Sequence, residues 1–136
     1  MNVVVEHLGA LQFRIKARRH VIECDQPEAD GGYDEGMTPP ELMLASLGAC
    51  AGFYAAQYLR KNGVATEGTQ VSVDAEKAQN PPRLDRFTIK VEAQVELTGE
   101  HRRGVEEAVR HCLIHNTLMH PPSIELQVLS AVTAGI

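Results

Sequence analysis

Residues 37–63, MTPPELMLASLGACAGFYAAQYLRKNG, form the longest apolar stretch of the chain and decide its fold. Thr38 is a typical helix N-cap, two prolines suit the first turn, and Glu41 complements the positive end of a helix dipole. The pair Asn62-Gly63 follows two basic residues, which is typical of a helix C-terminus. The sequence therefore predicts one long helix that begins just after Thr38 and ends before Asn62.

This helix is apolar on nearly all of its faces. No charged residue occurs from Leu42 to Leu59, a length close to the roughly 20 residues that a membrane span requires. However, the segment is rich in alanine, contains polar residues and is bracketed closely by Glu41 and by Arg60 and Lys61. We therefore expect a helix buried within a folded domain, and no membrane partner.

Alternation of apolar and polar residues predicts strands on both sides of the helix. The clearest run is residues 87–97, in which every second residue is apolar. The expected order is strands near residues 3–5, 11–15 and 21–24, the long helix, strands at 71–75 and 87–97, a helix over 99–112, and a final strand at 124–128. This βββ-α-ββ-α-β order predicts an α+β fold with antiparallel sheets.

Length and composition narrow the class of protein. The chain has 136 residues with 43% apolar residues, which predicts a single domain over residues 1–136. Its net charge of −5 gives no electrostatic reason to expect nucleic acid as a partner. Three cysteines are too few, and odd in number, for a secreted disulfide scaffold. We expect a reducing, cytoplasmic location.

Two glycines, Gly48 and Gly52, lie four residues apart in the predicted long helix. Each costs about 1 kcal/mol relative to alanine within a helix, which indicates that another backbone comes close. A two-fold homodimer in which the long helices pack together would supply the missing cover. The alternative is that the second helix of the same chain fills the groove, but one narrow apolar stripe gives little cover, so we favour the dimer.

Two cysteines occupy prominent positions. Cys50 lies in the middle of the long apolar helix, and Cys112 closes the apolar stripe of the second predicted helix. Cysteines in such places are core residues, a disulfide, metal ligands together with His111 and His115, or a redox pair. Cys24, at the end of a predicted strand, is expected to be a small core residue.

The cysteine segments resemble those of a known family. Residues 25–50, DQPEADGGYDEGMTPPELMLASLGAC, resemble the signature of the OsmC/Ohr family (osmotically inducible and organic-hydroperoxide-resistance proteins), and residues 111–118, HCLIHNTL, resemble its second cysteine motif. The resemblance implies an intertwined homodimer, with sheets from both chains wrapped around two central helices. It also implies a thiol peroxidase of oxidative-stress defence that reduces organic hydroperoxides. Cys50 would be the peroxidatic and Cys112 the resolving cysteine, with no bound cofactor or metal.

The chemistry expected of such a pair follows general rules. A thiolate that cleaves a peroxide becomes a sulfenic acid, which over-oxidises unless a second thiol condenses with it to a disulfide. An external dithiol must then supply electrons. Leu47, Phe53 and Tyr54 lie within a turn of Cys50 on the predicted helix and are expected to line an apolar substrate pocket.

The chain departs from the family pattern in the groups that activate the thiolate. Active family members use an arginine held by a glutamate, but the position of that glutamate is Pro40 here, one residue before Glu41, and the first predicted turn has no arginine. Arg14, Arg18 and Arg19 are the nearby substitutes. The alternative function is therefore a non-catalytic dimer of the same fold that binds a small apolar or electrophilic ligand near Cys50.

Overall fold

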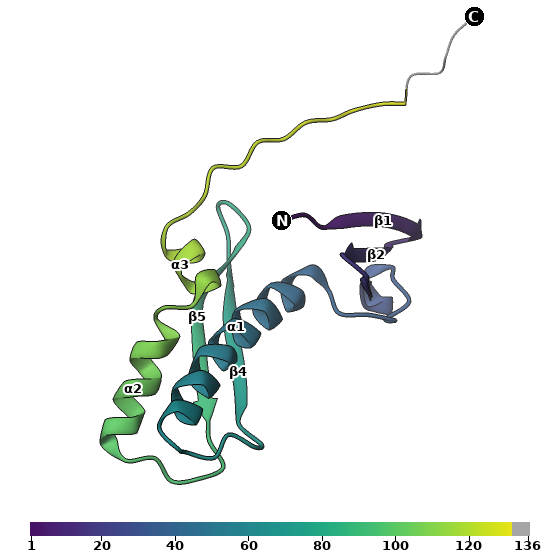
Figure 1. Cartoon of the computed structure of the whole chain (residues 1–136). Helices are drawn as coiled ribbons and strands as arrows, with labels where there is room; N and C mark the ends of the chain where they lie inside the picture. Colours follow the sequence, from purple (N-terminus) through teal and green to yellow (C-terminus); the bar gives the residue numbers. More distant parts are fainter. Residues whose placement is uncertain (132–136) are drawn as a thin grey trace, which may run out of the picture.

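Helix α1 (Pro39–Lys61) is the central element of the computed structural model, which describes residues 1–131 (Figure 1). The elements follow the order β1 (Val4–Gly9), β2 (Gln12–Ala17), β3 (His20–Cys24), the 3₁₀ turn η1 (Glu28–Asp30), α1, β4 (Gln70–Ala78), β5 (Arg83–Glu92), α2 (Gly99–Val109) and α3 (Leu113–Met119). The strands form two antiparallel sheets, β1-β2-β3 and β4-β5. The predicted α+β fold is confirmed.

The ends of α1 are fixed by the local signals that the sequence contains. Thr38 and Glu41 form a capping box, in which the Thr38 hydroxyl accepts from the Glu41 amide and donates to the Glu41 carboxylate at 2.7 Å. At the other end Asn62 is the C-cap, and Gly63 takes a positive φ of 69°, which ends the helix. The predicted bounds of the long helix are confirmed.

One face of α1 packs against the β4-β5 hairpin of the same chain. A Cβ atom added to Gly48 would lie 3.1 Å from a methyl group of Val73, and one added to Gly52 would lie 3.4 Å from a methyl group of Val71. The glycines therefore allow the strand to approach the helix closely. In the single chain the groups next to these glycines are the side chains of Val71 and Val73 on β4, not the backbone that the sequence led us to expect.

A second face of α1 packs against α2. Gly104 of α2 lies directly beneath the ring of Tyr58, whose hydroxyl is hydrogen-bonded to Nδ1 of His101 at 3.2 Å. Ala55, Leu59 and Val105 form the buried centre of this contact, with partly buried residues packed around them. Helix α2 therefore covers more of α1 than its narrow stripe alone led us to expect.

Helix α1 satisfies the length and composition of a membrane span. In this fold, however, it contacts β4, β5, α2 and α3 of its own chain. Its buried residues recur every four positions, at Leu47, Ala51, Ala55 and Leu59, which places one stripe of the helix in the protein core. We therefore assign α1 as a core helix.

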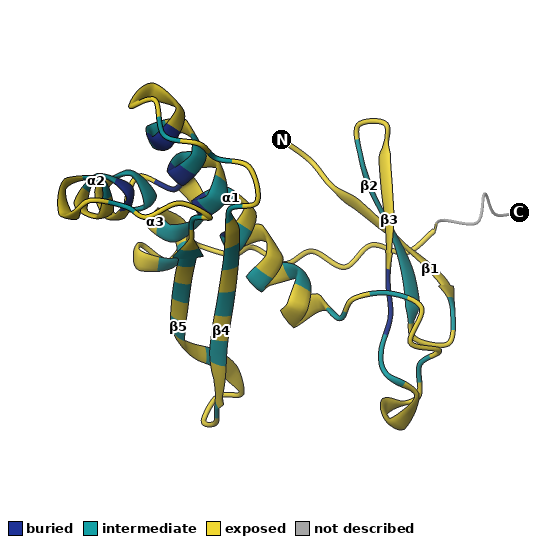
Figure 2. Cartoon of the chain, turned by 90° about the horizontal axis from the view of Figure 1, so that it is seen from below, coloured by how far each residue is buried: buried dark blue, intermediate teal, exposed yellow. Residues whose placement is uncertain are grey.

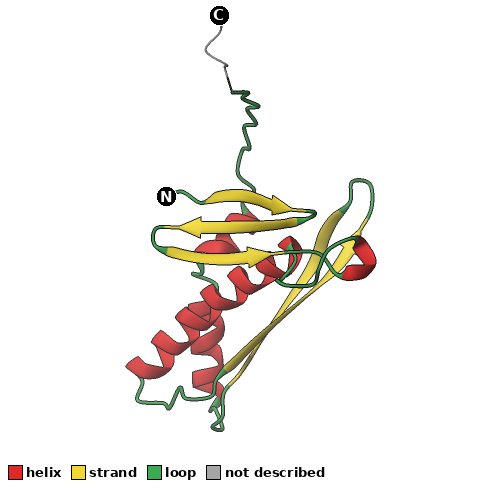
Figure 3. Ribbon diagram, turned by 90° about the vertical axis from the view of Figure 1, so that its right-hand side faces the viewer, coloured by secondary structure: helices red, strands yellow, loops and turns green. Residues whose placement is uncertain are grey.

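The three-stranded β1-β2-β3 sheet stands apart from the α1-centred body and joins it through the segment that precedes α1 (Figure 2). Figure 3 shows the three strands of this sheet side by side. Apolar side chains on this sheet are exposed, among them Val4, Val5, Val21 and Ile22. Figure 2 shows this sheet almost entirely in the exposed and intermediate colours. No described residue of the single chain covers this apolar surface of the sheet.

The segment between β3 and α1 is organised by the buried carboxylate of Asp25. It accepts hydrogen bonds from the backbone amides of Gln26 (2.8 Å), Tyr33 (3.2 Å) and Glu35 (3.2 Å), and from the side chain of Gln12 (3.4 Å). Burial alone raises the pKa of Asp25, but these hydrogen bonds outweigh it and hold the pKa below its usual value. One carboxylate thus fixes the loop that leads into α1.

The predicted strand at residues 124–128 is wrong for the single chain. Residues 121–131 form no strand and leave the body as an extended segment (Figure 1). Ile124, Leu126 and Val128 are 89%, 84% and 90% exposed. A strand requires a hydrogen-bonded neighbour, and this segment has none within the described residues.

Two further boundaries differ from the prediction. Strand β5 ends at Glu92, so residues 93–97 of the predicted strand instead lead toward α2. The predicted helix over 99–112 is interrupted after Val109 by a turn, and a separate helix, α3, begins at Leu113. The apolar stripe runs across both helices, which is why periodicity alone did not reveal the break.

The contact between α1 and α2 predicts the effect of Gly104→Ala. The added methyl group would overlap the Tyr58 ring, so we expect the free energy of unfolding to fall by about 1–3 kcal/mol. Gly99→Ala is the matched control, because its Cβ meets only the flexible end of Arg103 at 3.5 Å. Urea denaturation of the three proteins measures the difference, and equal loss of stability in both variants would contradict this packing.

The hydrogen bonds of Asp25 predict a pH-dependent effect of Asp25→Asn. Because the folded state lowers this pKa, the carboxylate stabilises the fold above the unfolded-state pKa of about 3.9, and the contribution disappears as pH falls through the folded-state pKa. We expect the variant to be less stable than wild type at pH 7, and the gap to close below about pH 4. A difference in unfolding free energy that stays constant between these pH values would argue against the assignment.

Candidate functional site

The structure brings Cys50 and Cys112 together. Cys50 lies midway along α1, and Cys112 is the N-cap residue of α3, which packs against α1. Their thiols lie close enough that each shifts the pKa of the other. Both remain free thiols, as does Cys24. A thiol pair formed by two distant parts of the sequence is therefore present in the single chain.

The turn between α2 and α3 sets the position of Cys112. The amides of His111 and Cys112 donate to the carbonyl groups of Ala108 and Val109, each at 3.0 Å, which closes α2 and reverses the chain. The Cys112 sulfur then accepts a hydrogen bond from the amide of His115 at 3.4 Å. Cys112 thus caps α3 in the way that serine or threonine caps other helices.

The first amides of α3 act on the other thiol. Burial raises the pKa of Cys50, but hydrogen bonds from the Cys112 thiol and from the backbone amides of Ile114 and Leu113 outweigh burial and lower it below the usual value. Cys50 therefore loses its proton more readily than an ordinary cysteine. These amides were not predictable from periodicity, because residues 111–112 continue the predicted helix over 99–112.

Cys112 has the opposite tendency. Burial raises its pKa, and so does the hydrogen bond that its thiol donates to Cys50. The pair therefore consists of one sulfur that releases its proton readily and one that retains it. This inequality is what separates a nucleophile from its resolving partner in disulfide chemistry.

The two sulfurs also differ in access. Cys50 is partly exposed on α1, whereas Cys112 is completely buried, with 0% of its surface accessible. Leu47 and Ala51, which flank Cys50 along the helix, are buried as well. A reagent from solvent therefore meets Cys50 first.

The apolar pocket expected from Leu47, Phe53 and Tyr54 is not formed in the single chain. Leu47 is a core residue, whereas Phe53 is 60% exposed and stacks edge-to-face with Tyr54, with ring centroids 5.1 Å apart. These three side chains thus point to different surroundings. In the described residues they do not enclose a site at Cys50.

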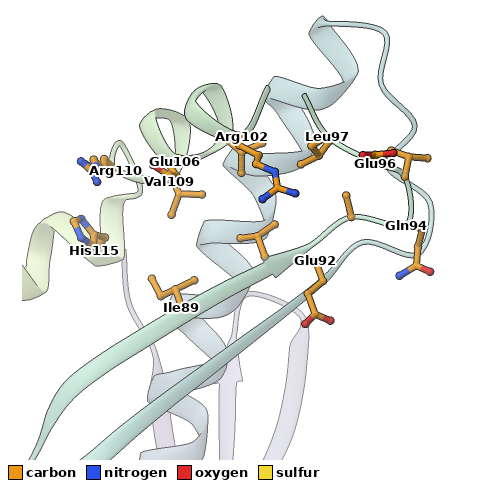
Figure 4. Close-up of a pocket in the computed structure, with 14 residues that line it drawn as sticks. Ile89, Glu92, Gln94, Glu96, Leu97, Arg102, Glu106, Val109, Arg110 and His115 are labelled. Carbon is orange, nitrogen blue, oxygen red and sulfur yellow. The ribbon is translucent and has the colours of Figure 1, made fainter. Parts of the chain in front are cut away.

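A cavity of about 750 Å³ lies elsewhere, between β5 and α2 (Figure 4). Its walls are partly apolar, with Ile89 on β5 and Val105 and Val109 on α2, and His115 closes one end. Neither Cys50 nor Cys112 lines it. It meets the thiol pair only through His115, whose amide bonds to Cys112 and whose Nδ1 is buried without a hydrogen-bond partner among the described residues.

The substitutes proposed for the activating arginine lie on the separate sheet. Arg14 on β2 forms a cross-strand ion pair with Glu23 at 3.6 Å, and Arg18 and Arg19 occupy the turn before β3. Figure 1 shows that this sheet stands away from the middle of α1. Glu41 is engaged in the capping box, where its hydrogen bonds to Thr38 lower its pKa. In the described part of the chain, none of these residues shifts the pKa of Cys50.

The metal-ligand alternative finds no support in the geometry. Among residues 1–131, no group of three or more His, Cys, Asp or Glu side chains is gathered to hold a metal ion. Nδ1 of His111 lies 2.9 Å from the carbonyl oxygen of Glu107, in the preceding turn. Cys24 is buried, and its backbone forms a parallel bridge with Met37, in line with the core role predicted for it.

Comparison with protein families and solved structures gives a consistent result. Residues 32–127 match the family model described as OsmC-like protein. No match was found among the curated proteins.

Three solved structures illustrate the similarity. A protein of Psychrobacter arcticus, named for osmotic stress induction and a detoxification response, has a TM-score of 0.78 at 20% identity, over 86% of this chain and 87% of that one. An organic hydroperoxide resistance protein OsmC of Legionella pneumophila has a TM-score of 0.58 at 14% identity (87% and 89%). One from Elizabethkingia anophelis has a TM-score of 0.55 at 19% identity (85% and 91%). At these identities the similarity establishes the fold.

The inequality of the two thiols predicts the pH dependence of alkylation. Because the Cys112 thiol helps to stabilise the Cys50 thiolate, Cys112→Ala should raise the pKa of Cys50 and slow its reaction with iodoacetamide severalfold at pH 7. Rates at the Cys50 peptide, measured by mass spectrometry across a pH series, test this. Cys24→Ala is the control and should leave the profile unchanged. An unshifted profile in Cys112→Ala would show that the thiol contact has no influence on ionisation.

Proposed function

Because the chain belongs to the OsmC-like protein family, we propose that it is a thiol-dependent peroxidase that reduces organic hydroperoxides, with Cys50 as the peroxidatic and Cys112 as the resolving cysteine. The observation that carries this proposal is that α1 and α3 bring the two thiols together, with the pKa of Cys50 lowered and that of Cys112 raised. One sulfur that loses its proton more readily and one that retains it suit a nucleophile and its resolving partner.

The proposed cycle uses only the two sulfurs and external reactants. The Cys50 thiolate attacks the terminal oxygen of the hydroperoxide, the O–O bond breaks, and the alkoxide leaves as the alcohol after taking up a proton. The Cys50 sulfenic acid then condenses with the Cys112 thiol, forming the disulfide and releasing water. A dithiol reductant donates two electrons, is oxidised to its own disulfide and restores both thiols.

The substrate class is supported by the solved structures and by the surroundings of Cys50. The Legionella and Elizabethkingia proteins are named organic hydroperoxide resistance proteins. In this chain Leu47 and Ala51 place apolar side chains beside Cys50, which suits an organic hydroperoxide better than a strongly hydrated one. We therefore assign a role in oxidative-stress defence in the cytoplasm, with no metal or bound cofactor in the cycle.

We further propose that the working form is a homodimer. Ala45, Ala49, Phe53 and Gln57 form an exposed stripe along α1. The β1-β2-β3 sheet and residues 121–131 add further uncovered apolar surface. Contiguous apolar surface of this kind is typical of protein interfaces, and a second copy is the simplest partner that covers all three regions.

A homodimer would also bring an arginine side chain near Cys50. In the single chain the sheet that bears Arg14, Arg18 and Arg19 stands apart from Cys50. A second copy packed against the exposed stripe of α1 would bring its own sheet near that helix. These arginines therefore remain our candidates for a cation that assists the thiolate.

The proposed activity predicts a clear division between the cysteine variants. With cumene hydroperoxide and a dithiol reductant, Cys50→Ser should lower turnover to the background rate, because no other sulfur in the pair is disposed to ionise. Cys112→Ser should retain the first reduction of peroxide but lose sustained turnover, with sulfinic acid accumulating at Cys50 by mass spectrometry. Cys24→Ser is the matched control and should turn over at the wild-type rate.

Equal rates in wild type and Cys50→Ser would contradict the peroxidase. That result would favour the alternative of a non-catalytic dimer, in which Cys50 lines a site for a small apolar or electrophilic ligand.

A further inference from the structure

We propose that an external thiol opens the Cys50–Cys112 disulfide by attacking the sulfur of Cys50, so that the mixed disulfide forms on Cys50 and Cys112 leaves. This inference rests on the proposed function, because it requires that the pair cycles through a disulfide. It specifies which sulfur the reductant must meet, a point that the peroxidase cycle leaves open.

The first argument is access. Cys112 is 0% exposed and is the N-cap of α3, directly after the turn that joins α2 to α3. Cys50 lies on α1 with part of its surface exposed. Burial by a second copy can only add to the cover over either sulfur. Cys112 is therefore shielded with or without a second copy, whereas Cys50 has surface that a thiol can approach in the single chain.

Leaving-group chemistry, in contrast, favours attack on Cys112. In thiol–disulfide exchange the sulfur of lower pKa leaves faster. The folded protein lowers the pKa of Cys50 and raises that of Cys112, so this effect alone would favour attack on Cys112 with departure of Cys50. Access thus favours attack on Cys50, whereas leaving-group pKa favours attack on Cys112. The sulfur that forms the mixed disulfide shows which effect is larger.

We expect access to have the larger effect, because attack on Cys112 requires the fold to open locally. The first turn of α3 would have to separate from α1, breaking the bond from the His115 amide to the Cys112 sulfur and the bond from the Asn116 amide to the Cys112 carbonyl at 2.9 Å. Attack on Cys50 requires no such opening. Reaction at the accessible sulfur therefore proceeds from the folded state.

The exchange balances as follows. The reductant thiolate forms an S–S bond with Cys50 while the Cys50–Cys112 bond breaks, and the electron pair of that bond leaves with Cys112. Cys112, whose pKa is raised by burial, takes up a proton and becomes the thiol. With a dithiol, the second thiolate attacks the reductant sulfur of the mixed disulfide, releases the Cys50 thiolate and leaves the reductant oxidised. With a monothiol the sequence pauses at the mixed disulfide.

A trapping experiment with a monothiol tests the proposal independently of hydroperoxide turnover. The protein is oxidised with diamide, treated briefly with glutathione, quenched with acid, and its free thiols are blocked with N-ethylmaleimide. Digestion at glutamate separates Cys24 from Cys50, because Glu28, Glu35 and Glu41 lie between them. Mass spectrometry then reports glutathione and maleimide at each cysteine.

We expect glutathione on Cys50 and maleimide on Cys112, in at least about tenfold excess over the reverse pattern, which corresponds to about 1.4 kcal/mol. The same reaction in denaturant is the control, because both sulfurs are then accessible and the preference should largely disappear. Glutathione found mainly on Cys112 in the folded protein would overturn the inference and leave the peroxidase standing. Failure of diamide to join Cys50 to Cys112 would instead overturn the proposed function, and the inference with it.

Discussion

The proximity of the Cys50 and Cys112 thiols depends on a single local feature, the end of α2 at Val109. If that helix continued for another turn, residues 110–113 would follow its axis and the amides of Leu113 and Ile114 would lie inside the helix, bonded to carbonyl groups. Because the chain instead turns and restarts, these amides are free to face Cys50. The difference in pKa between Cys50 and Cys112 thus arises from the turn between α2 and α3.

The rest of the α1-centred body holds α1 in the position that places Cys50 next to Cys112. Glycines are used wherever something must approach closely: Gly48 and Gly52 admit β4, and Gly104 admits the ring of Tyr58. Each contact fixes a different side of α1, so the helix cannot rotate without a clash on one of them. The position of Cys50 relative to α3 is therefore set by packing at some distance from the sulfur.

Much of this arrangement was predictable from the sequence, for identifiable reasons. Thr38, Glu41 and Gly63 determined the ends of α1 because helix caps are local signals. The pairing of Cys50 with Cys112 came from resemblance to a family, since spacing alone left several roles open. Two features were not predictable from periodicity. The apolar stripe of Val105, Val109 and Cys112 passes through the break between α2 and α3. Residues 124–128 alternate like a strand but have no neighbour in the single chain.

The extended segment at residues 121–131 affects how newly synthesised protein behaves in a cell. A newly synthesised copy displays this alternating apolar segment, and the open edges of its three-stranded sheet, before it meets another copy. Chaperones recognise unpaired strand edges and exposed apolar segments. The same features cause precipitation at high expression. For the homodimer proposed above, the abundance of the protein would thus depend on how quickly newly synthesised copies associate, which is separate from the chemistry of its sulfurs.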